Sequence, residues 1–229
     1  MKKRLWFVML LGVAANRVGA ADAPQLSTDE QKASYAVGLE IAQSLVRQGL
    51  KIDADAFSLA LKDVLSGQEP RLPLKELQAV LAKQQEKIIQ KRQAAAQKNK
   101  AASETFLTEN KKKEGIQVLP SGVQYRVLTE GKGAKPKLTD TVTVHYRGTL
   151  TDGKEFDSSY GRGEPATFQV NGVIQGWQEV LPMMQEGAKW QVFIPPDLAY
   201  GDRGAGDAIG PNETLIFDIE LIAVKSPSN

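Results

Sequence analysis

Residues 74–114 contain neither proline nor glycine, and this uninterrupted stretch constrains the fold of the chain more than any other feature. Pro73 precedes the stretch, and proline is favoured in the first turn of a helix. One helix of about 40 residues would be about 60 Å long, at 1.5 Å per residue. The sequence therefore predicts a long connecting helix at residues 73–114, with separate structures before and after it.

The predicted connecting helix is apolar only near its start. Its apolar residues form a partial stripe, interrupted at Gln84 and Lys91, that consists of Leu74, Leu77, Val80, Leu81 and Ile88. An interrupted stripe does not support a long coiled coil. In residues 90–103 the apolar side chains are all alanines, so we predict a rigid spacer that buries almost nothing there.

The second part of this helix is basic. Residues 83–113 carry nine basic and three acidic side chains, a local charge of +6 that could attract nucleic acid or an anionic surface. No aromatic residues alternate with the basic ones, as stacking on bases would require. We therefore expect a solvated helix face and no nucleic-acid partner.

The first 21 residues have the pattern of a signal peptide. Lys2, Lys3 and Arg4 precede an apolar run that ends at Ala15, and small residues follow at 18–21. This run is shorter than the ~20 residues that span a bilayer, and we expect no membrane span in the mature protein. Without residues 1–21, 25 basic and 27 acidic residues give a net charge of −2. The expected location is the periplasm, with outer-membrane association or secretion as alternatives.

Residues 22–72 are predicted to form an all-α dimerisation domain. Ser27 and Glu30 have capping-box spacing before a first helix, and Gly67 ends a second one. Two apolar stripes at helical spacing are Val37, Ile41 and Leu45, then Phe57, Ala60, Leu61, Val64 and Leu65. So few residues can hardly bury a stable core alone. We expect a homodimer through residues 22–90, with Leu45, Phe57, Leu61 and Leu77 in the contact.

After Gly115 the apolar pattern changes from helical to alternating. The alternating segments are 123–127, 142–146, 190–194 and 215–221, and residues 167–170 are a further candidate strand. Only residues 173–181 have helix-like spacing, with Ile174, Trp177 and Leu181 on one side. Residues 115–229 are thus expected to form an α+β domain, an antiparallel sheet wrapped on a short helix.

Most catalytic chemistry is excluded by composition. The chain has no cysteine, and its one histidine, His145, is expected on the strand face opposite Tyr146 with a structural role. The glycine-rich residues 201–207 lack the Gly-Lys-Ser/Thr ending of a phosphate loop and the final Glu of a calcium loop. We expect neither a metal nor a cofactor.

Aromatic residues remain as candidates, where predicted strands meet turns: Tyr146, Phe156, Phe168, Trp177, Tyr200 and Phe217. Any one of them alone is more often part of a core. Their surroundings form five blocks at residues 144–148, 152–159, 173–177, 198–201 and 215–221. In these blocks the chain resembles the FKBP family of peptidyl-prolyl cis/trans isomerases. Its whole arrangement is similar to the Mip-like and FkpA-like members of the bacterial cell envelope.

The resemblance implies an isomerase site in residues 115–229. It gives catalytic roles to Tyr146, Phe156, Asp157, Trp177, Tyr200 and Phe217, and substrate-binding roles to Arg162, Phe168, Val173, Ile174 and Ile209. In this assignment Trp177 is the floor of an apolar pocket. The Tyr200 hydroxyl and the Ile174 amide bind substrate carbonyls, and Arg162 pairs with Asp157.

Three departures from the family pattern concern the rim of the expected pocket. Ala166 stands where a second aromatic residue is common, the segment between Phe168 and Val173 is short, and residues 204–211 are rich in glycine and alanine. These differences affect the expected substrate preference, not the floor.

The expected activity needs no acid or base. Rotation about an X-Pro bond crosses a barrier of ~20 kcal/mol that arises from amide resonance, and an apolar pocket favours the twisted amide over the planar one. The expected partners are proline-containing, unfolded or partly folded envelope proteins, and the resemblance adds macrolide inhibitors such as tacrolimus and rapamycin. The alternative is a prolyl-peptide-binding chaperone or virulence-type interaction factor with incidental isomerase activity.

Overall fold

The computed structural model describes residues 26–227, so the signal peptide predicted at residues 1–21 lies outside the described residues. The chain divides into two compact units, residues 1–57 and 58–229. No helix in residues 26–227 combines the length and the apolar character that a bilayer span requires.

Helix α1 (Asp29–Arg47) has its N-cap at Thr28, one residue after the predicted cap Ser27. The Thr28 side chain accepts a hydrogen bond from the Gln31 amide, and the Gln31 side chain accepts one from the Thr28 amide. The capping box predicted at Ser27 and Glu30 was therefore wrong, because Thr28 and Gln31 have the same spacing and form it instead. No residue of α1 is buried, and Val37 and Ile41 of its apolar stripe are 57% and 45% exposed.

Helix α2 (Ala54–Leu65) ends before Gly67, whose positive φ of 65° suits a glycine after a helix. The buried residue of α2 is Asp63, and Arg71 in the following loop donates two hydrogen bonds to its carboxylate at 2.6 and 3.0 Å. Hydrogen bonding to Arg71 lowers the pKa of Asp63. This fork ties the loop before α3 to α2.

Helix α3 (Leu74–Asn110) is continuous over 37 residues, as the lack of proline and glycine predicted. The prediction that residues 90–103 bury almost nothing was wrong at the end of that range. Ser103 is 4% exposed and Asn110, farther along the helix, is 1% exposed. These polar residues are buried because the strands and loops after α3 provide their hydrogen-bond partners.

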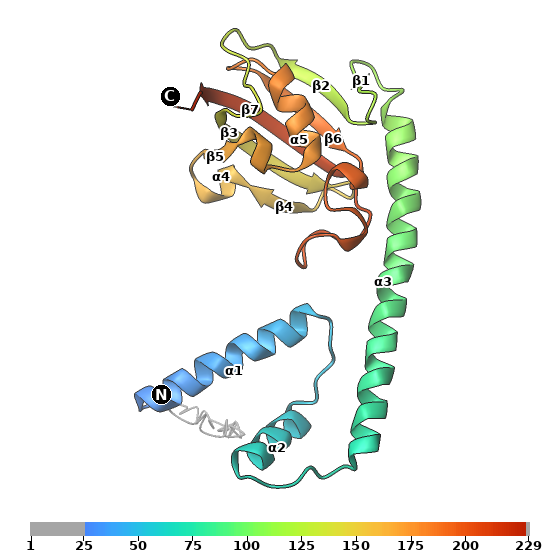
Figure 1. Ribbon diagram of the computed structural model, residues 1–229, viewed down its shortest axis with the longest axis vertical. Coiled ribbons are helices and arrows are strands. Elements are labelled where there is room, and N and C mark those ends of the chain that lie inside the picture. The colour runs from blue at the N-terminus through green and yellow to red at the C-terminus, as the bar shows by residue number, and fades with distance from the viewer. Residues whose placement is uncertain (1–25, 228–229) are drawn as a thin grey trace, which may run out of the picture. The chain divides into compact units, whose positions relative to one another are not determined.

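Beyond α3 the chain forms an antiparallel sheet in the order β1-β2-β6-β7-β3-β4, with β5 paired to β3. The strands are β1 (Gln117–Val118), β2 (Gln124–Thr129), β3 (Thr141–Leu150), β4 (Glu155–Ser158), β5 (Ala166–Gln169), β6 (Lys189–Ile194) and β7 (Leu215–Lys225). Figure 1 shows the sheet curving around helix α5 (Gln175–Val180). The predicted α+β class, with a sheet wrapped on a short helix, is confirmed.

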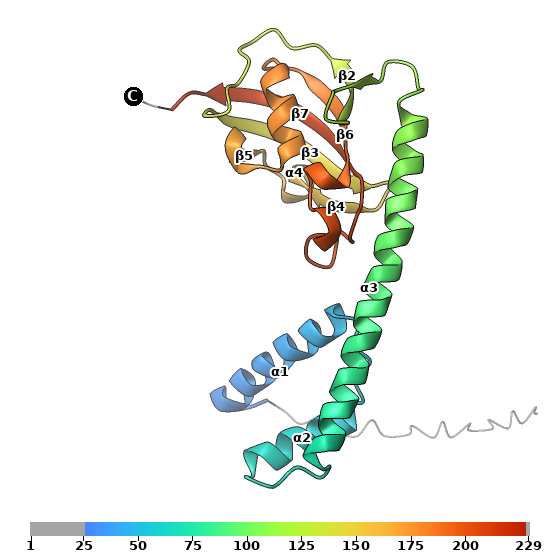
Figure 2. The ribbon, with the colours of Figure 1, turned by 45° about the vertical axis from the view of Figure 1, so that its right-hand side comes forward.

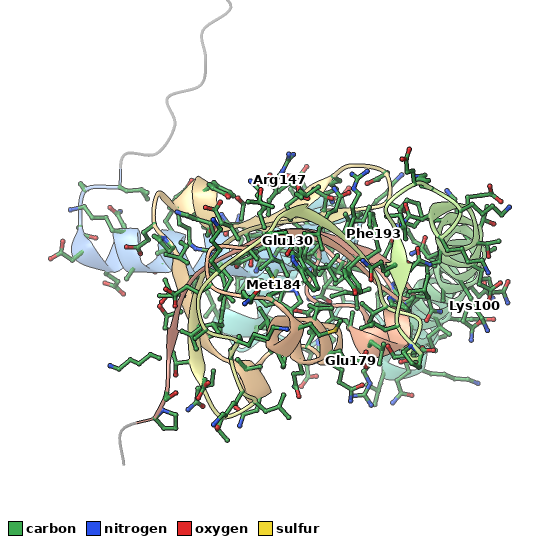
Figure 3. All side chains as sticks on the ribbon, turned by 90° about the horizontal axis from the view of Figure 1, so that it is seen from above. Lys100, Glu130, Arg147, Glu179, Met184 and Phe193 are labelled. Carbon is green, nitrogen blue, oxygen red and sulfur yellow. The ribbon has the colours of Figure 1, made fainter. Side chains whose placement is uncertain are left out.

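The core lies between the sheet and α5. Strand β3 alternates strictly, with Val142, Val144 and Tyr146 buried and His145 only half-buried on the other face. Trp177 and Val180 of α5 are buried against this face of the sheet. Met184, beyond the short 3-10 helix Leu181–Met183, is fully buried, whereas Arg147 on β3 is exposed (Figure 3).

The second half of α3 lies along the sheet, as both ribbon views show (Figures 1 and 2). Phe106 of α3 packs against Phe193 of β6 with 5.9 Å between ring centroids. Asn110 donates a hydrogen bond to the buried Gln124 side chain, which in turn donates to the Leu107 carbonyl. This half of the helix is therefore part of the same packed unit as the sheet.

Candidate active site

A cavity of about 440 Å³ lies between α5, the concave face of the sheet and the segments after β5 and β6. Its lining residues are Tyr146, Phe156, Asp157, Phe168, Gly172, Val173, Ile174, Trp177, Tyr200 and Phe217. Most of them were named as site residues from the sequence. Gly172 was not, because a glycine before the helix offers no side chain to signal a role.

Trp177 lies at the centre of the aromatic lining. Its ring is nearly perpendicular to those of Tyr146, Phe168 and Phe217, at centroid distances of 5.4, 5.9 and 5.2 Å. Phe156 meets Phe217 in the same edge-to-face manner at 5.5 Å. Edge-to-face contacts fix ring orientations, so the cavity has stiff apolar walls.

The register of the strands brings these rings together. Gly148 of β3 pairs with Asp157 of β4 on one side and Phe217 of β7 on the other. A Cβ at position 148 would lie 2.6 Å from the Phe156 ring and 2.9 Å from the Phe217 ring. The absence of a side chain at Gly148 therefore allows the two phenylalanines to meet over the strand.

One polar network lies at the cavity wall. The Tyr146 hydroxyl donates to Asp157 Oδ2, and Arg162 donates to Asp157 Oδ1 at 2.6 Å and to the Tyr146 hydroxyl at 2.8 Å. Arg162 does not line the cavity, although its guanidinium lies 5.5 Å from the centre of the Tyr146 ring. It comes from the short helix α4 (Ser159–Arg162). Arg162 is thus a partner of lining residues.

The network moves the pKa values of Tyr146 and Asp157 apart. Burial raises the pKa of Tyr146, and its hydrogen bond to Asp157 raises that pKa further. Burial also acts to raise the pKa of Asp157, but hydrogen bonds from Tyr146 and Arg162 outweigh it and the pKa lies below its ordinary value. Tyr146 therefore stays protonated and Asp157 ionised.

The segment after β6 supplies the outer edge of the cavity. Tyr200 is 41% exposed at this edge and lies directly before the 3-10 helix Gly201–Arg203. Ile174 lines the cavity at the start of α5. Ile209, expected to bind substrate, does not line it; its side chain is 7% exposed and belongs to the hydrophobic core.

His145 lies on the opposite face of β3 from the cavity, as the strand alternation predicted. Its Nδ1 is 3.0 Å from Ser159 Oγ, and its ring stacks on Tyr160 at 4.6 Å. Within residues 26–227, no group of three or more histidine, cysteine or acidic side chains could hold a metal ion. The groups that line the cavity offer apolar walls and hydrogen-bonding side chains.

Two family models match this chain. The model described as FKBP-type peptidyl-prolyl cis-trans isomerase covers residues 132–222, which include every residue of the cavity lining. The model described as the domain amino-terminal to FKBP-type peptidyl-prolyl isomerase covers residues 30–127. The chain belongs to the FKBP family. It is an FKBP-type peptidyl-prolyl cis/trans isomerase.

Relatives of this FKBP match it almost end to end. "Outer membrane protein MIP" of Legionella longbeachae is 46% identical, over 98% of this chain and 99% of its own. "Peptidyl-prolyl cis-trans isomerase Mip" of Coxiella burnetii is 43% identical, over 95% and 94%. The crystal structure of FkpA from Escherichia coli aligns with a TM-score of 0.63 and 38% identity, over 88% of this FKBP and 99% of that chain.

Proposed function

We propose that the cavity around Trp177 is the isomerase site, with the roles that the family resemblance implied. The observation that carries this proposal is the single aromatic enclosure, in which Tyr146, Phe168 and Phe217 each meet Trp177 edge to face. The substrate proline ring would lie on the indole of Trp177. The X-Pro bond would then extend toward the edge that holds Asp157 and Tyr200.

The proposed mechanism is rotation without bond breaking. The planar amide carries separated partial charges, which a cavity with apolar walls solvates poorly, whereas the twisted amide is less polar. The Tyr200 hydroxyl and the Ile174 amide would hold the carbonyls on either side of the rotating bond. Asp157 keeps Tyr146 oriented, since it accepts the hydrogen bond of that hydroxyl. Each such contact accelerates the reaction only if it is stronger in the twisted state.

Replacement of Trp177 tests the site, and the chain offers a matched control in Trp190. Trp190 is also buried, but it stacks on Tyr125 at 4.5 Å and does not line the cavity. Trp177→Leu should lower kcat/KM on a prolyl tetrapeptide by about tenfold or more, whereas Trp190→Phe should leave it within about twofold. Equal losses in the two variants would reject the site. No catalysis by the unmodified protein would reject the enzyme and favour a prolyl-binding chaperone.

We propose further that the mature protein is a homodimer through residues 22–90. Its helices expose apolar side chains that a soluble monomer rarely leaves in contact with water, among them Leu61 at 53%, Leu65 at 78% and Leu81 at 69%. Leu45 and Leu77 are partly covered, and Phe57 is 41% exposed. A symmetric contact between two copies would bury such stripes.

The proposed clients are unfolded or partly folded proteins of the cell envelope that contain proline, and the proposed location is the periplasm, with outer-membrane association or secretion as alternatives. Support comes from the charged and apolar pattern of residues 1–21 and from the envelope relative whose name refers to the outer membrane. Tacrolimus and rapamycin would occupy the cavity in place of the prolyl ring. Competition of either macrolide with a prolyl peptide would test that part of the proposal.

A further inference from the structure

Helix α3 contacts one loop of the isomerase domain by hydrogen bonds. This loop, residues 201–212, follows Tyr200 and leads into β7. Arg92 Nη2 donates to the Arg203 carbonyl at 2.8 Å, and Asn99 Nδ2 donates to the Pro211 carbonyl at 2.9 Å. Both ends of the loop are thus attached to the same helix.

Ser103 makes the most buried of these contacts. Its hydroxyl donates to the Asn212 carbonyl at 2.8 Å and accepts from the Thr214 amide at 3.0 Å. Asn212 Nδ2 reaches back to the Ala96 carbonyl at 3.3 Å. Because Ser103 is 4% exposed, water cannot readily replace its hydrogen bonds if the hydroxyl is removed.

The contacts of α3 lie on one side of the helix. Arg92, Ala96, Asn99 and Ser103 are spaced by four, three and four residues, which is the repeat of one helix face. A single docked face therefore holds the loop at several points, and the helix is stiff over this length because its own hydrogen bonds are continuous.

Inside the loop, backbone hydrogen bonds connect the residues that contact α3 to Tyr200 at the cavity edge. The Asn212 amide donates to the Gly201 carbonyl at 2.8 Å, which closes the loop beside Tyr200. The Gly204 amide donates to the Tyr200 carbonyl at 3.2 Å, and Ala205 and Ile209 exchange hydrogen bonds across the loop. Asn212 adopts a left-handed φ of 55°, a conformation that asparagine tolerates better than most residues.

We propose that Ser103 and Asn99 of α3 are positioning residues for the isomerase reaction, which act through the loop on Tyr200. The connecting helix is then part of the catalytic unit, in addition to joining it to the first helices. Neither residue lines the cavity, and their effect depends on where the loop places the Tyr200 hydroxyl. The inference rests on the proposed role of Tyr200 in binding substrate.

The test uses the full chain and two side-chain deletions, Ser103→Ala and Asn99→Ala. Alanine is a strong helix former, so neither change should weaken α3 itself. Thr105→Ala is the matched control, because the Thr105 hydroxyl donates only to the Ala101 carbonyl of its own helix. Should Ser103→Ala fail to fold, Asn99→Ala still provides the test, since its contact is only part-buried.

The first readout is amide hydrogen exchange of residues 201–212, with strand β3 as the internal reference. Loss of the Ser103 hydroxyl should speed exchange of the loop by roughly tenfold and leave β3 unchanged, as expected for a few lost hydrogen bonds. Thr105→Ala should leave both segments unchanged. Unaltered loop exchange in both Ser103→Ala and Asn99→Ala would overturn the proposal, and this result does not depend on any catalytic activity.

The second readout is a double-mutant cycle in catalysis. Ser103→Ala should lower kcat/KM on a prolyl peptide by about threefold or more, and the loss should disappear when Tyr200→Phe is already present. A purely structural effect would instead give the same loss in both backgrounds, and that result would overturn the proposal. An unmodified protein without isomerase activity would reject the proposed function, while the exchange measurement would still test the attachment of the loop.

Discussion

The guanidinium of Arg162 binds Asp157 and Tyr146 at the same time, with its Nη1 2.6 Å from Asp157 Oδ1 and its Nη2 2.8 Å from the Tyr146 hydroxyl. The side chains of Arg162 and Asp157 are 47% and 43% exposed, so solvent screens their attraction and the pair contributes at most about 1 kcal/mol to stability. Its main effect is to orient the Tyr146 hydroxyl.

The first prediction concerns acid stability. The pKa of Asp157 is lowered in the folded state, so its ionised form stabilises the fold above the ordinary value of 3.8. That contribution is lost as the pH falls through the lowered pKa. Arg162→Ala removes one cause of the shift and should move the acid-unfolding midpoint upward by a few tenths of a pH unit, measured by tryptophan fluorescence. Lys189→Ala is the control, because it removes an exposed ion pair in which Lys189 Nζ lies 3.9 Å from Glu220 Oε2.

The second prediction concerns Gly148. An added Cβ would meet the rings of Phe156 and Phe217, so Gly148→Ala should destabilise the domain by about 1–3 kcal/mol and lower kcat/KM as the aromatic wall shifts. Gly161→Ala, on the neighbouring helix α4, is the control because no atom lies within 4 Å of its added Cβ. Thermal unfolding and peptide assays of both variants provide the measurement. Equal melting temperatures and equal kcat/KM in the two variants would contradict close packing of the rings at Gly148.

The third prediction concerns assembly. Leu61→Glu places a charge in the proposed contact between two copies and should convert the dimer into a monomer. The full chain has a mass of 25.0 kDa, and the dimer has twice the mass of the monomer. Activity on a short peptide should persist, because Leu61 is not among the residues that line the cavity. Val118→Glu, at a residue that is 51% exposed on β1, is the control. Sedimentation velocity distinguishes the species, and a monomeric unmodified protein would reject the dimer.

The fourth prediction concerns where the isomerase domain begins. A fragment that starts at residue 90 keeps the contacts of Ser103 and Phe106, whereas one that starts at residue 115 loses both. The shorter fragment should melt a few degrees lower, because a loss of 1 kcal/mol shifts the midpoint of a domain of this size by about 2–8 °C. Calorimetry of the two fragments gives the comparison. Identical midpoints would mean that the second half of α3 adds nothing to the domain.

The strands that alternate over several residues could be predicted from the sequence. In β3 and β7 one face of the strand is buried and the other is not, so every second side chain is apolar and the alternation is visible in the sequence. The two-residue strand β1 and the four-residue β4 are too short to carry such a pattern. Their pairing is decided by neighbours in space.

The helix face that contacts the loop was missed for a related reason. Asn99, Ser103 and Asn110 repeat at helical spacing, but they are polar, and a polar stripe on a basic helix is ordinarily exposed to solvent. What buries Ser103 is a pair of backbone groups at Asn212 and Thr214, more than 100 residues farther along the chain. The spacing of residues in one sequence cannot predict backbone partners that lie so far along the chain.

Most of the expected site residues line the cavity, but Arg162 and Ile209 do not. Composition argued against metal and nucleophilic chemistry, but the grouping of Tyr146, Phe156 and Trp177 came from the family resemblance and not from any periodicity. Ile209 illustrates the limit, because an apolar residue near the cavity and an apolar residue in the core look alike in sequence.

Helix α3 holds the loop after Tyr200 through the backbone carbonyls of Arg203, Pro211 and Asn212. A carbonyl is the same whichever side chain accompanies it, so the exposed side chains of Asp202 and Arg203 can change without altering those three contacts, whereas Ile209 belongs to the core and must stay apolar. Evolution, or a designed library, could therefore vary the surface that the loop offers to substrates while its attachment stays in place. Specificity could then diversify among relatives with little loss of stability.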